Sequence, residues 1–111
     1  MSDSSPISSQ SGKPTSSIAV VILTYNEELN IAQALDSVSG WANEIFILDS
    51  FSMDKTLEIA SRYDCKIEKN KFEDYAKQRN FAIDQLPITS EWVLFLDADE
   101  WLPNELKQEI S

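Results

Sequence analysis

The sequence predicts an α/β fold in which helices cover both faces of a mostly parallel sheet. Short apolar runs, typical of strands buried on both faces, recur at residues 18–23, 44–49 and 92–96. Segments with apolar residues at three- and four-residue spacing lie between these runs. Alternating strands and helices form parallel sheets with right-handed connections, so few topologies remain. Ligands of such sheets bind beyond the carboxyl ends of the strands.

The first strand and helix follow a segment that is expected to be a disordered tail. Residues 1–17 contain eight Ser and only one large aliphatic residue, Ile7, so they cannot bury enough surface to offset the entropy lost on ordering. The folded domain is therefore expected to span residues 18–111. Its first apolar run is a strand, and a helix follows that Asn26 caps and Gly40 ends. The apolar stripe of this helix consists of Ile31, Ala34, Leu35 and Val38.

A second strand and helix repeat this pattern. The run at residues 44–49 has the texture of a buried strand. Ser52 and Asp54 precede the next helix as candidate caps. The helical spacing is carried by Thr56, Ile59, Ala60 and Tyr63.

The rest of the chain continues the alternation. A short strand at residues 65–68 precedes a helix at about residues 74–86, which Pro87 ends. The strand at residues 92–96 is the most apolar one. Pro103 begins a last helix, whose apolar residues are Leu102, Leu106 and Ile110.

The composition excludes several classes of function. Acidic residues outnumber basic ones 19 to 9 and the net charge is −10, so nucleic-acid binding, which depends on Lys and Arg, is not expected. A ligand with phosphates would need a divalent cation, held by Asp, to offset the repulsion. The sequence contains no His and a single cysteine, Cys65. These two facts exclude His-based catalysis, a disulfide within the chain and a cysteine metal site.

The sequence also bears on location. No apolar run approaches the length of a membrane span, and the N-terminus lacks the layout of a signal peptide. A single thiol suits a reducing compartment. We therefore expect a cytoplasmic protein, and a peripheral position at the inner face of the membrane stays open.

Two carboxylates follow the most apolar strand. The side chains of Asp97 and Asp99 point to the same side if the chain stays extended. Paired carboxylates at a strand end can hold Mg²⁺ or Mn²⁺ against a diphosphate. The alternative is a solvated turn that caps the next helix, and these residues alone leave both interpretations open.

Two other strand ends offer binding groups. Thr24-Tyr25-Asn26-Glu27 supplies a hydroxyl, an aromatic face and an amide where a base and a ribose could lie, or only a cap and a turn. Asp49 ends the second strand and is placed to accept a hydrogen bond from a base N–H or a ribose hydroxyl. Helix capping accounts for Ser52 or Asp54 but explains Asp49 poorly.

Together these segments resemble a family 2 glycosyltransferase. The resemblance is carried by VILTYNEE at 21–28, DSxSxD at 49–54, KQRNFA at 77–82 and WVLFLDADE at 92–100. The motifs occur in the family's order and spacing over residues 18–111, which is far more specific than Asp-x-Asp alone. The sequence is most similar to the bacterial branch that includes lipopolysaccharide-core glucosyltransferases.

The resemblance implies a GT-A fold, a Rossmann-like three-layer α/β architecture, and assigns roles to single residues. Thr24-Tyr25-Asn26-Glu27 would line the base pocket, and Asp49 would recognise the base. Asp97 would approach the ribose and, with Asp99, hold the Mg²⁺ or Mn²⁺ ion that bridges the diphosphate. Arg79 would face the nucleotide sugar, the alternative being a surface charge on its helix.

The implied activity is transfer of a sugar from a nucleotide sugar, expected to be a UDP-sugar, to a glycan or lipid-linked acceptor by metal-assisted inverting displacement. In the family, a base in a further C-terminal half deprotonates the acceptor hydroxyl. Nothing in this chain matches that half, so a fragment with only the donor and metal site is expected. Residues 92–96 would then form an open edge, which leads to self-association or to pairing with a separately encoded C-terminal half.

Two residues depart from the family pattern, and two other functions stay open. Phe51 and Met53 stand where the family generally has Gly and often has Thr. Gly at such a turn permits a positive φ or a close approach of the backbone. Phe51 is therefore expected to change either the local backbone conformation or the fit of the donor. The other functions are a nucleotide-binding remnant without activity and a Mg²⁺-dependent phosphohydrolase with an aspartyl-phosphate intermediate. The latter normally carries its Asp-x-Asp on the first strand rather than the fourth.

Overall fold

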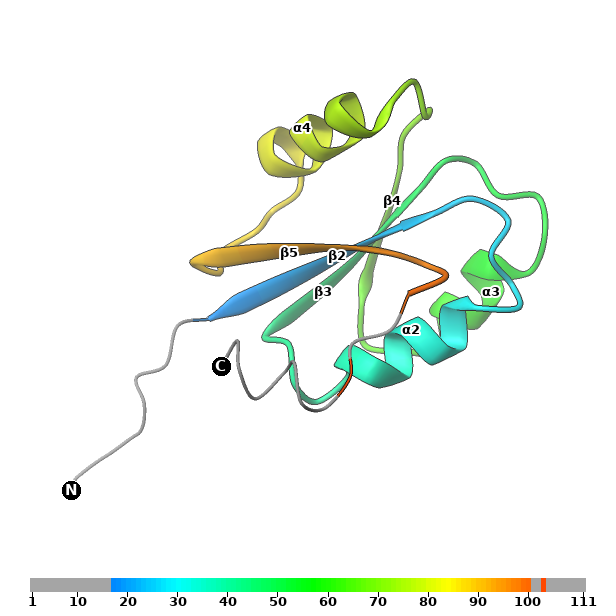
Figure 1. The fold of residues 1–111 in the computed structure, drawn as a ribbon, viewed down its shortest axis with the longest axis horizontal. Coiled ribbons are helices and arrows are strands. Elements are labelled where there is room, and N and C mark those ends of the chain that lie inside the picture. The colour runs from blue at the N-terminus through cyan, green and yellow to red at the C-terminus, as the bar shows by residue number, and fades with distance from the viewer. Residues whose placement is uncertain (1–16, 101–102, 104–111) are drawn as a thin grey trace.

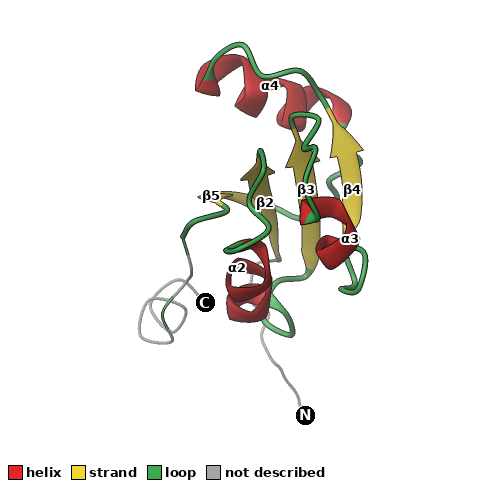
Figure 2. Cartoon of the chain, turned by 90° about the vertical axis from the view of Figure 1, so that its right-hand side faces the viewer, coloured by secondary structure: helices red, strands yellow, loops and turns green. Residues whose placement is uncertain are grey.

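Four strands form a parallel sheet, and their order decides which segments meet at its edges. The computed structural model of the chain describes residues 17–100 and 103. The strands are β2 (Ile18–Thr24), β3 (Glu44–Asp49), β4 (Lys66–Lys69) and β5 (Trp92–Asp97), in the order β4-β3-β2-β5. Every pairing is parallel, and Figure 2 shows the arrowheads of β2, β3 and β4 pointing the same way. The predicted α/β fold with a parallel sheet is confirmed.

Helices cover both faces of this sheet and give three layers. α2 (Ile31–Val38) and α3 (Thr56–Ala60) pack on one face, and α4 (Tyr75–Gln85) packs on the other (Figure 1). β2 serves both cores, because successive side chains of a strand point to opposite faces. Val20 belongs to the buried cluster of α2, whereas Val21 belongs to that of α4. The apolar run of β2 is continuous because both of its faces are buried.

The predicted cap of the first helix was wrong. α2 begins at Ile31 with Asn30 at its N-cap, whereas Asn26 lies in the preceding loop with a positive φ of 51°. Its side chain bonds to another loop instead of to α2. The predicted end of α2 agrees with the structure, since Gly40 follows the C-cap Ser39 and adopts a φ of 79°.

The other two helices agree to different degrees. α3 ends at Ala60, so Tyr63, which the apolar spacing assigned to the helix, lies beyond it. The Tyr63 hydroxyl donates a hydrogen bond of 2.8 Å to Asp36 on α2, a partner that the local spacing does not reveal. α4 has the predicted boundaries to within one residue, with Asp74 as its N-cap.

The two ends of the chain lie largely outside the described residues. The predicted disordered tail falls on residues 1–17, of which only Ser17 is described. Ser17 belongs to the fold: its hydroxyl oxygen accepts a hydrogen bond of 3.0 Å from the Glu91 N–H, and its carbonyl accepts one of 3.1 Å from the Trp92 N–H. The last predicted helix falls on residues of which only Pro103 is described. Within the part of the chain that is described, no helix is long and apolar enough to cross a membrane.

A carboxylate at the amino end of β3 fixes the connection that leads into β5. Glu44 Oε1 accepts hydrogen bonds from the Thr89 N–H at 3.0 Å, the Ser90 N–H at 2.9 Å and the Ser90 hydroxyl at 2.7 Å. Burial alone would raise the pKa of Glu44, but the hydrogen bonds from Ser90 and Thr89 outweigh it and hold the pKa below its ordinary value. This contact secures the start of β5 beside β2.

We expect Glu44→Gln to lower the free energy of unfolding by about 1–2 kcal/mol at pH 7, because hydrogen bonds to a charged acceptor are lost. A depressed folded-state pKa stabilises the protein above the unfolded pKa, and this stabilisation disappears as the pH falls through the folded value. The difference in the free energy of unfolding between wild type and variant should therefore become smaller below about pH 4. Urea unfolding at neutral and acidic pH measures it, with Glu91→Gln on the exposed neighbouring turn as the control. A difference that is the same at both pH values would contradict the assigned role of Glu44.

Candidate functional site

A cleft of about 530 Å³ opens where the carboxyl ends of the strands meet the start of α4. It is the place where parallel sheets bind ligands. Five of the predicted site residues line it, namely Thr24, Tyr25, Glu27, Asp97 and Asp99. The other three predicted residues are described but lie outside its lining: Asn26, Asp49 and Arg79. The structure thus brings the strand ends of β2 and β5 to one site, as the sequence predicted.

Asp97 and Asp99 reach the cleft through a turn. The expectation of an extended chain was wrong, because β5 ends at Asp97 and residues 98–99 turn. The Glu100 N–H donates to the Asp97 carbonyl at 2.9 Å, and the Ala98 N–H donates to the Leu23 carbonyl at 3.2 Å. This second bond holds the turn against the end of β2. Both carboxylates still line the same cleft.

The electrostatics of this end of the cleft favour a cation. Burial raises the pKa of Asp97, and the negative charges of Glu100 and Asp99 raise it further, while Arg79 acts in the opposite direction. A cation between the carboxylates would relieve this repulsion. Residues 17–100 and 103 contain no group of three or more Asp, Glu, Cys or His side chains that could hold a metal ion. Two carboxylates nevertheless fit Mg²⁺ or Mn²⁺, which take their remaining oxygen ligands from phosphates and water.

Asp49 is fully buried, with 0% of its surface exposed. Its Oδ1 accepts hydrogen bonds from the Thr24 hydroxyl at 2.6 Å and the Ser52 hydroxyl at 2.5 Å, and its Oδ2 accepts one from the Ser52 N–H at 2.7 Å. The carboxylate therefore joins the end of β2 to the loop after β3. Base recognition by Asp49 stays a prediction, and in this structure the carboxylate lies beneath the cleft.

The loops after β2 and β3 are joined by further hydrogen bonds. The Asn26 N–H donates to the Ser52 hydroxyl oxygen at 2.8 Å, and Asn26 Oδ1 accepts from the Met53 N–H at 2.7 Å. The Glu27 N–H donates to Thr56 Oγ1 at 2.7 Å. These bonds fix the segment that presents Tyr25 and Glu27 to the cleft. Asn26 is thus a link between loops.

The candidate caps of α3 behave differently from each other. Asp54 accepts hydrogen bonds from the Thr56 N–H at 2.9 Å and from the Thr56 hydroxyl, and its other oxygen accepts from the Glu28 N–H at 3.1 Å. It therefore supports the start of α3, but from the position before the N-cap, which is Lys55. Ser52 does not cap the helix, because its hydroxyl bonds to Asp49 and Asn26.

Phe51 occupies the backbone conformation that the family's Gly suggests. Its φ is 61°, in the left-handed region that costs a non-glycine residue about 1–2 kcal/mol. Phe51 thus adopts a positive φ, which Gly adopts without strain. The Phe51 ring is 55% exposed, and Met53 next to it is exposed as well.

Arg79 lies beside the cleft on α4. Its guanidinium carbon is 6.0 Å from the centroid of the Tyr75 ring and 5.9 Å from that of Phe95. Its charge opposes the rise in the pKa of Asp97, and its contact with Phe95 places it beside β5. Its predicted role toward the nucleotide sugar stays a prediction.

The sequence interpretation missed the wall that α4 and its preceding loop contribute. This wall includes Lys71, Phe72, Tyr75 and Gln78, and Ser50, which follows β3, also lines the cleft. Gln78 is almost fully buried and its amide nitrogen donates to the Ser50 hydroxyl oxygen at 3.1 Å. A signal was available: Gln78 precedes Ala82 by four positions, and both face inward on α4. A polar residue on the buried face of a helix needs partners, which points to a network beside the site.

Comparison with known proteins places the chain among glycosyltransferases. The model of "Glycosyl transferase family 2" matches residues 19–110. An uncharacterized glycosyltransferase of Rickettsia conorii is 36% identical over 97 residues, which are 87% of this chain and 34% of that protein. The chain therefore spans about a third of the length of this curated relative.

Solved structures show the same fold. TarS of S. aureus in complex with UDP is 28% identical, with a TM-score of 0.64 over 84% of this chain and 30% of that chain. A mannosyltransferase of Pyrobaculum calidifontis, in complex with GDP-Man and Mn²⁺, is 26% identical, with a TM-score of 0.64 over 84% of this chain and 31% of that one. These matches confirm the predicted GT-A architecture for the described part of the chain.

The structure generates a test for Asp49. We expect Asp49→Asn to lower the free energy of unfolding by about 1–3 kcal/mol, because an amide cannot accept from the three donors that the carboxylate serves. Urea unfolding measures the loss, and Asp84→Asn on the exposed face of α4 is the matched control. A loss below about 0.5 kcal/mol, the usual range for a surface change, would show that the network does not depend on the Asp49 charge.

Proposed function

The chain belongs to glycosyl transferase family 2, and from this membership we propose that residues 17–100 form the site that binds the nucleotide-sugar donor and its metal ion. The observation that supports this proposal is the convergence of Asp97 and Asp99 with Thr24, Tyr25 and Glu27 on one cleft. These residues come from the ends of β2 and β5, which are adjacent parallel strands. Two carboxylates beside an aromatic ring suit a ligand that combines a diphosphate with a base.

We assign the roles as follows. Asp99 and Asp97 hold a divalent cation, Mg²⁺ or Mn²⁺, and Asp97 also lies toward the ribose. Thr24, Tyr25, Asn26 and Glu27 form one side of the base pocket, with Asp49 beneath it. Arg79 contributes a positive charge from α4. When bound, the cation neutralises the diphosphate that leaves during transfer.

The donor is a UDP-sugar in this proposal. The related TarS structure contains UDP, whereas the related mannosyltransferase contains GDP-Man. Family membership therefore does not decide which nucleobase the donor carries. Binding of UDP, GDP and ADP to the same preparation decides among them.

The acceptor reaction completes the proposal. A base deprotonates an acceptor hydroxyl, which attacks the anomeric carbon from the side opposite to the leaving diphosphate. We place this base and the acceptor site outside residues 17–100, because the carboxylates in the cleft serve the donor and the metal. We propose a glycan or lipid-linked acceptor, as in lipopolysaccharide-core synthesis, on the cytoplasmic side of the membrane.

The alternative is a nucleotide-binding remnant without transferase activity. The same cleft would bind the donor even if the protein had no catalytic base. Turnover of a UDP-sugar by the purified chain, with and without Mn²⁺, separates the two functions. Transfer by the purified chain would require a catalytic base within residues 1–111, and it would contradict a remnant without activity.

Metal-dependent nucleotide binding tests the donor site. We expect UDP to bind at least about tenfold more tightly with Mn²⁺ than with EDTA, because the protein is strongly acidic. In Asp99→Asn this dependence should fall to about twofold or less. Calorimetry measures both affinities, with Asp64→Asn as the control because Asp64 is exposed and lies outside the cleft. Equal UDP affinity in Mn²⁺ and EDTA for the wild type would rule out the assigned role of Asp99.

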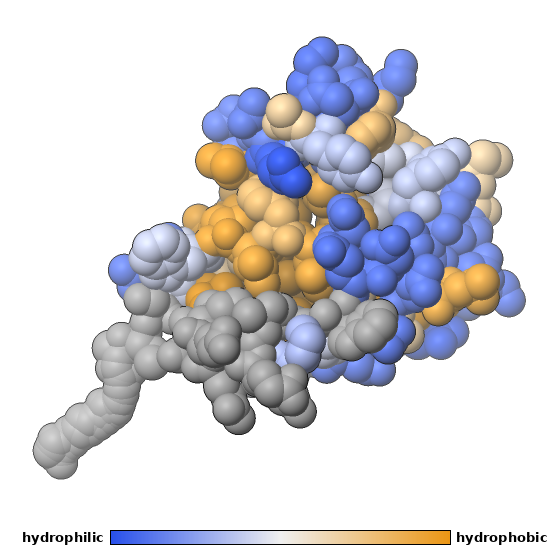
Figure 3. Space-filling view, in the orientation of Figure 1, coloured by the Kyte–Doolittle hydropathy of each residue, from blue (hydrophilic) through white to orange (hydrophobic). Residues whose placement is uncertain are grey.

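The outer edge of β5 supports the proposal of a further partner. β5 pairs only with β2 among the described strands, and Trp92 at its start is 62% exposed. Figure 3 shows apolar side chains gathered on this face of the molecule, below α4. A long apolar strand edge pairs with other chains unless it is covered. We propose that a second copy of the chain pairs with this edge.

Sedimentation velocity over a range of concentrations tests the edge. We expect the purified chain to self-associate, and Trp92→Lys to shift it toward the monomer, because a charge on an edge strand opposes pairing. Ile83→Lys, on an exposed position of α4, is the matched control and should leave the association unchanged. A monomer at all concentrations would contradict self-association through β5.

A further inference from the structure

The cleft has two chemically different ends. Asp97 and Asp99 lie at the end of β5, whereas Phe72 and Tyr75 lie after β4, at the start of α4. β4 and β5 are the two edges of the described sheet. Neighbouring strands lie about 4.8 Å apart, so the tips of β4 and β5 are separated by about 14 Å. A ligand that fills the cleft meets carboxylates at one end and aromatic rings at the other.

The two rings form an open aromatic wall. Their centroids are 5.1 Å apart and the ring planes make an angle of 77°, the edge-to-face geometry that aromatic pairs favour. Phe72 is 44% exposed and Tyr75 is 52% exposed, although both line the cleft. Both residues therefore combine exposed surface with a place in the lining of the cleft.

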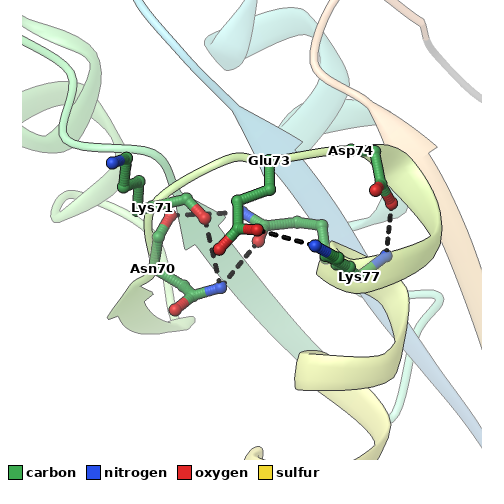
Figure 4. A network of polar contacts seen from close by, with 6 residues as sticks. Asn70, Lys71, Glu73, Asp74 and Lys77 are labelled. Atoms are coloured by element: carbon green, nitrogen blue, oxygen red, sulfur yellow. Dashed lines mark hydrogen bonds and ion pairs between the residues drawn. The ribbon is translucent and has the colours of Figure 1, made fainter.

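The segment that carries the rings is anchored on both sides. Asp74 accepts a hydrogen bond of 2.8 Å from the Lys77 N–H, and Lys77 Nζ lies 2.8 Å from Glu73 Oε1 (Figure 4). On the other side, Gln78 Oε1 accepts a bond of 2.9 Å from the Asn70 amide. The start of the helix and the preceding loop thus fix the position of the rings.

Gln78 and Asn70 tie this segment to the tip of β3. The Gln78 amide nitrogen donates to Ser50 at 3.1 Å, and the Asn70 N–H donates to the Asp49 carbonyl at 2.9 Å. Because Ser50 directly follows β3, the segment that carries the rings is held beside the tip of β3. The exposed surfaces of Phe72 and Tyr75 therefore lie on a segment that hydrogen bonds hold in place.

We propose that Phe72 and Tyr75 form the stacking wall for the nucleobase of the donor and determine how tightly the base is held. This inference rests on the proposed donor function. The diphosphate and the sugar attached to it lie at the carboxylate end with the cation, so the base is the part of the donor that reaches the far end. A base is planar and has apolar faces, which fits two exposed rings better than it fits charged groups.

Calorimetry of the full chain with UDP in Mn²⁺ tests the wall. Phe72→Leu and Tyr75→Leu keep apolar volume but remove the aromatic face, and at least one of them should weaken UDP binding about tenfold. Tyr75→Phe keeps the face and should bind like the wild type. Ile83→Ala is the matched control, because it removes a similarly exposed apolar side chain of α4 that lies outside the cleft. Thermal unfolding of each variant confirms that it is folded.

The outcomes separate this inference from the donor proposal. A wild type that fails to bind UDP in Mn²⁺ overturns both. A wild type that binds UDP, while both Leu variants bind within about twofold of it, overturns the aromatic wall alone. An equal loss in Ile83→Ala also overturns it, because the effect would then be unrelated to the cleft. Inorganic pyrophosphate, which has no base, should bind to wild type and Leu variants alike.

Discussion

The buried carboxylate of Asp49 is the interaction on which the arrangement of the cleft depends. A buried charge is tolerated only where hydrogen bonds replace the water it has lost, and here the Thr24 hydroxyl and two groups of Ser52 provide them. The same bonds fix the end of β2 to the loop after β3. The Ser52 hydroxyl oxygen also accepts a hydrogen bond from the Asn26 N–H. This bond restrains the segment that presents Tyr25 and Glu27. One carboxylate thereby aligns the loops of two strands.

The fold was largely predictable because its two central strands, β2 and β3, are buried on both faces. β2 and β3 are central in the sheet, so their apolar runs are continuous and their boundaries differ from the prediction by at most one residue. β4 is an edge strand in which Ile67 is partly buried and the other three residues are exposed. Its sequence therefore has no continuous apolar run, and the strand was harder to predict. The cap of α2 was assigned wrongly because the partners of Asn26 lie in the next loop, 26 and 27 positions away. Local sequence preferences carry no information about such partners.

The candidate site was predictable in part, for a related reason. Strand ends can be read from the sequence, and they located Asp97, Asp99 and the segment after β2. Burial of Asp49 could not be read, because the donors that surround it include Thr24, 25 positions away. Phe72, Tyr75 and Gln78 were missed because the direction in which α4 crosses the sheet is set by tertiary packing. Their helical spacing is unremarkable, and only the buried position of Gln78 hints at a polar network.

The parallel pairing of β2 with β5 has a consequence for how the chain reaches this structure. Ser17 and Glu91, which meet at the start of these strands, are 74 positions apart. Closing such a long loop costs entropy before the pairing returns any energy, so contacts of this kind slow folding. Of the described strands, β2 is synthesised first and β5 last. The edge of β2 that pairs with β5 therefore stays unpaired until β5 has been synthesised. The strand that contributes most to the core is therefore also the one exposed longest in the nascent chain, which makes it a natural segment for a chaperone to protect.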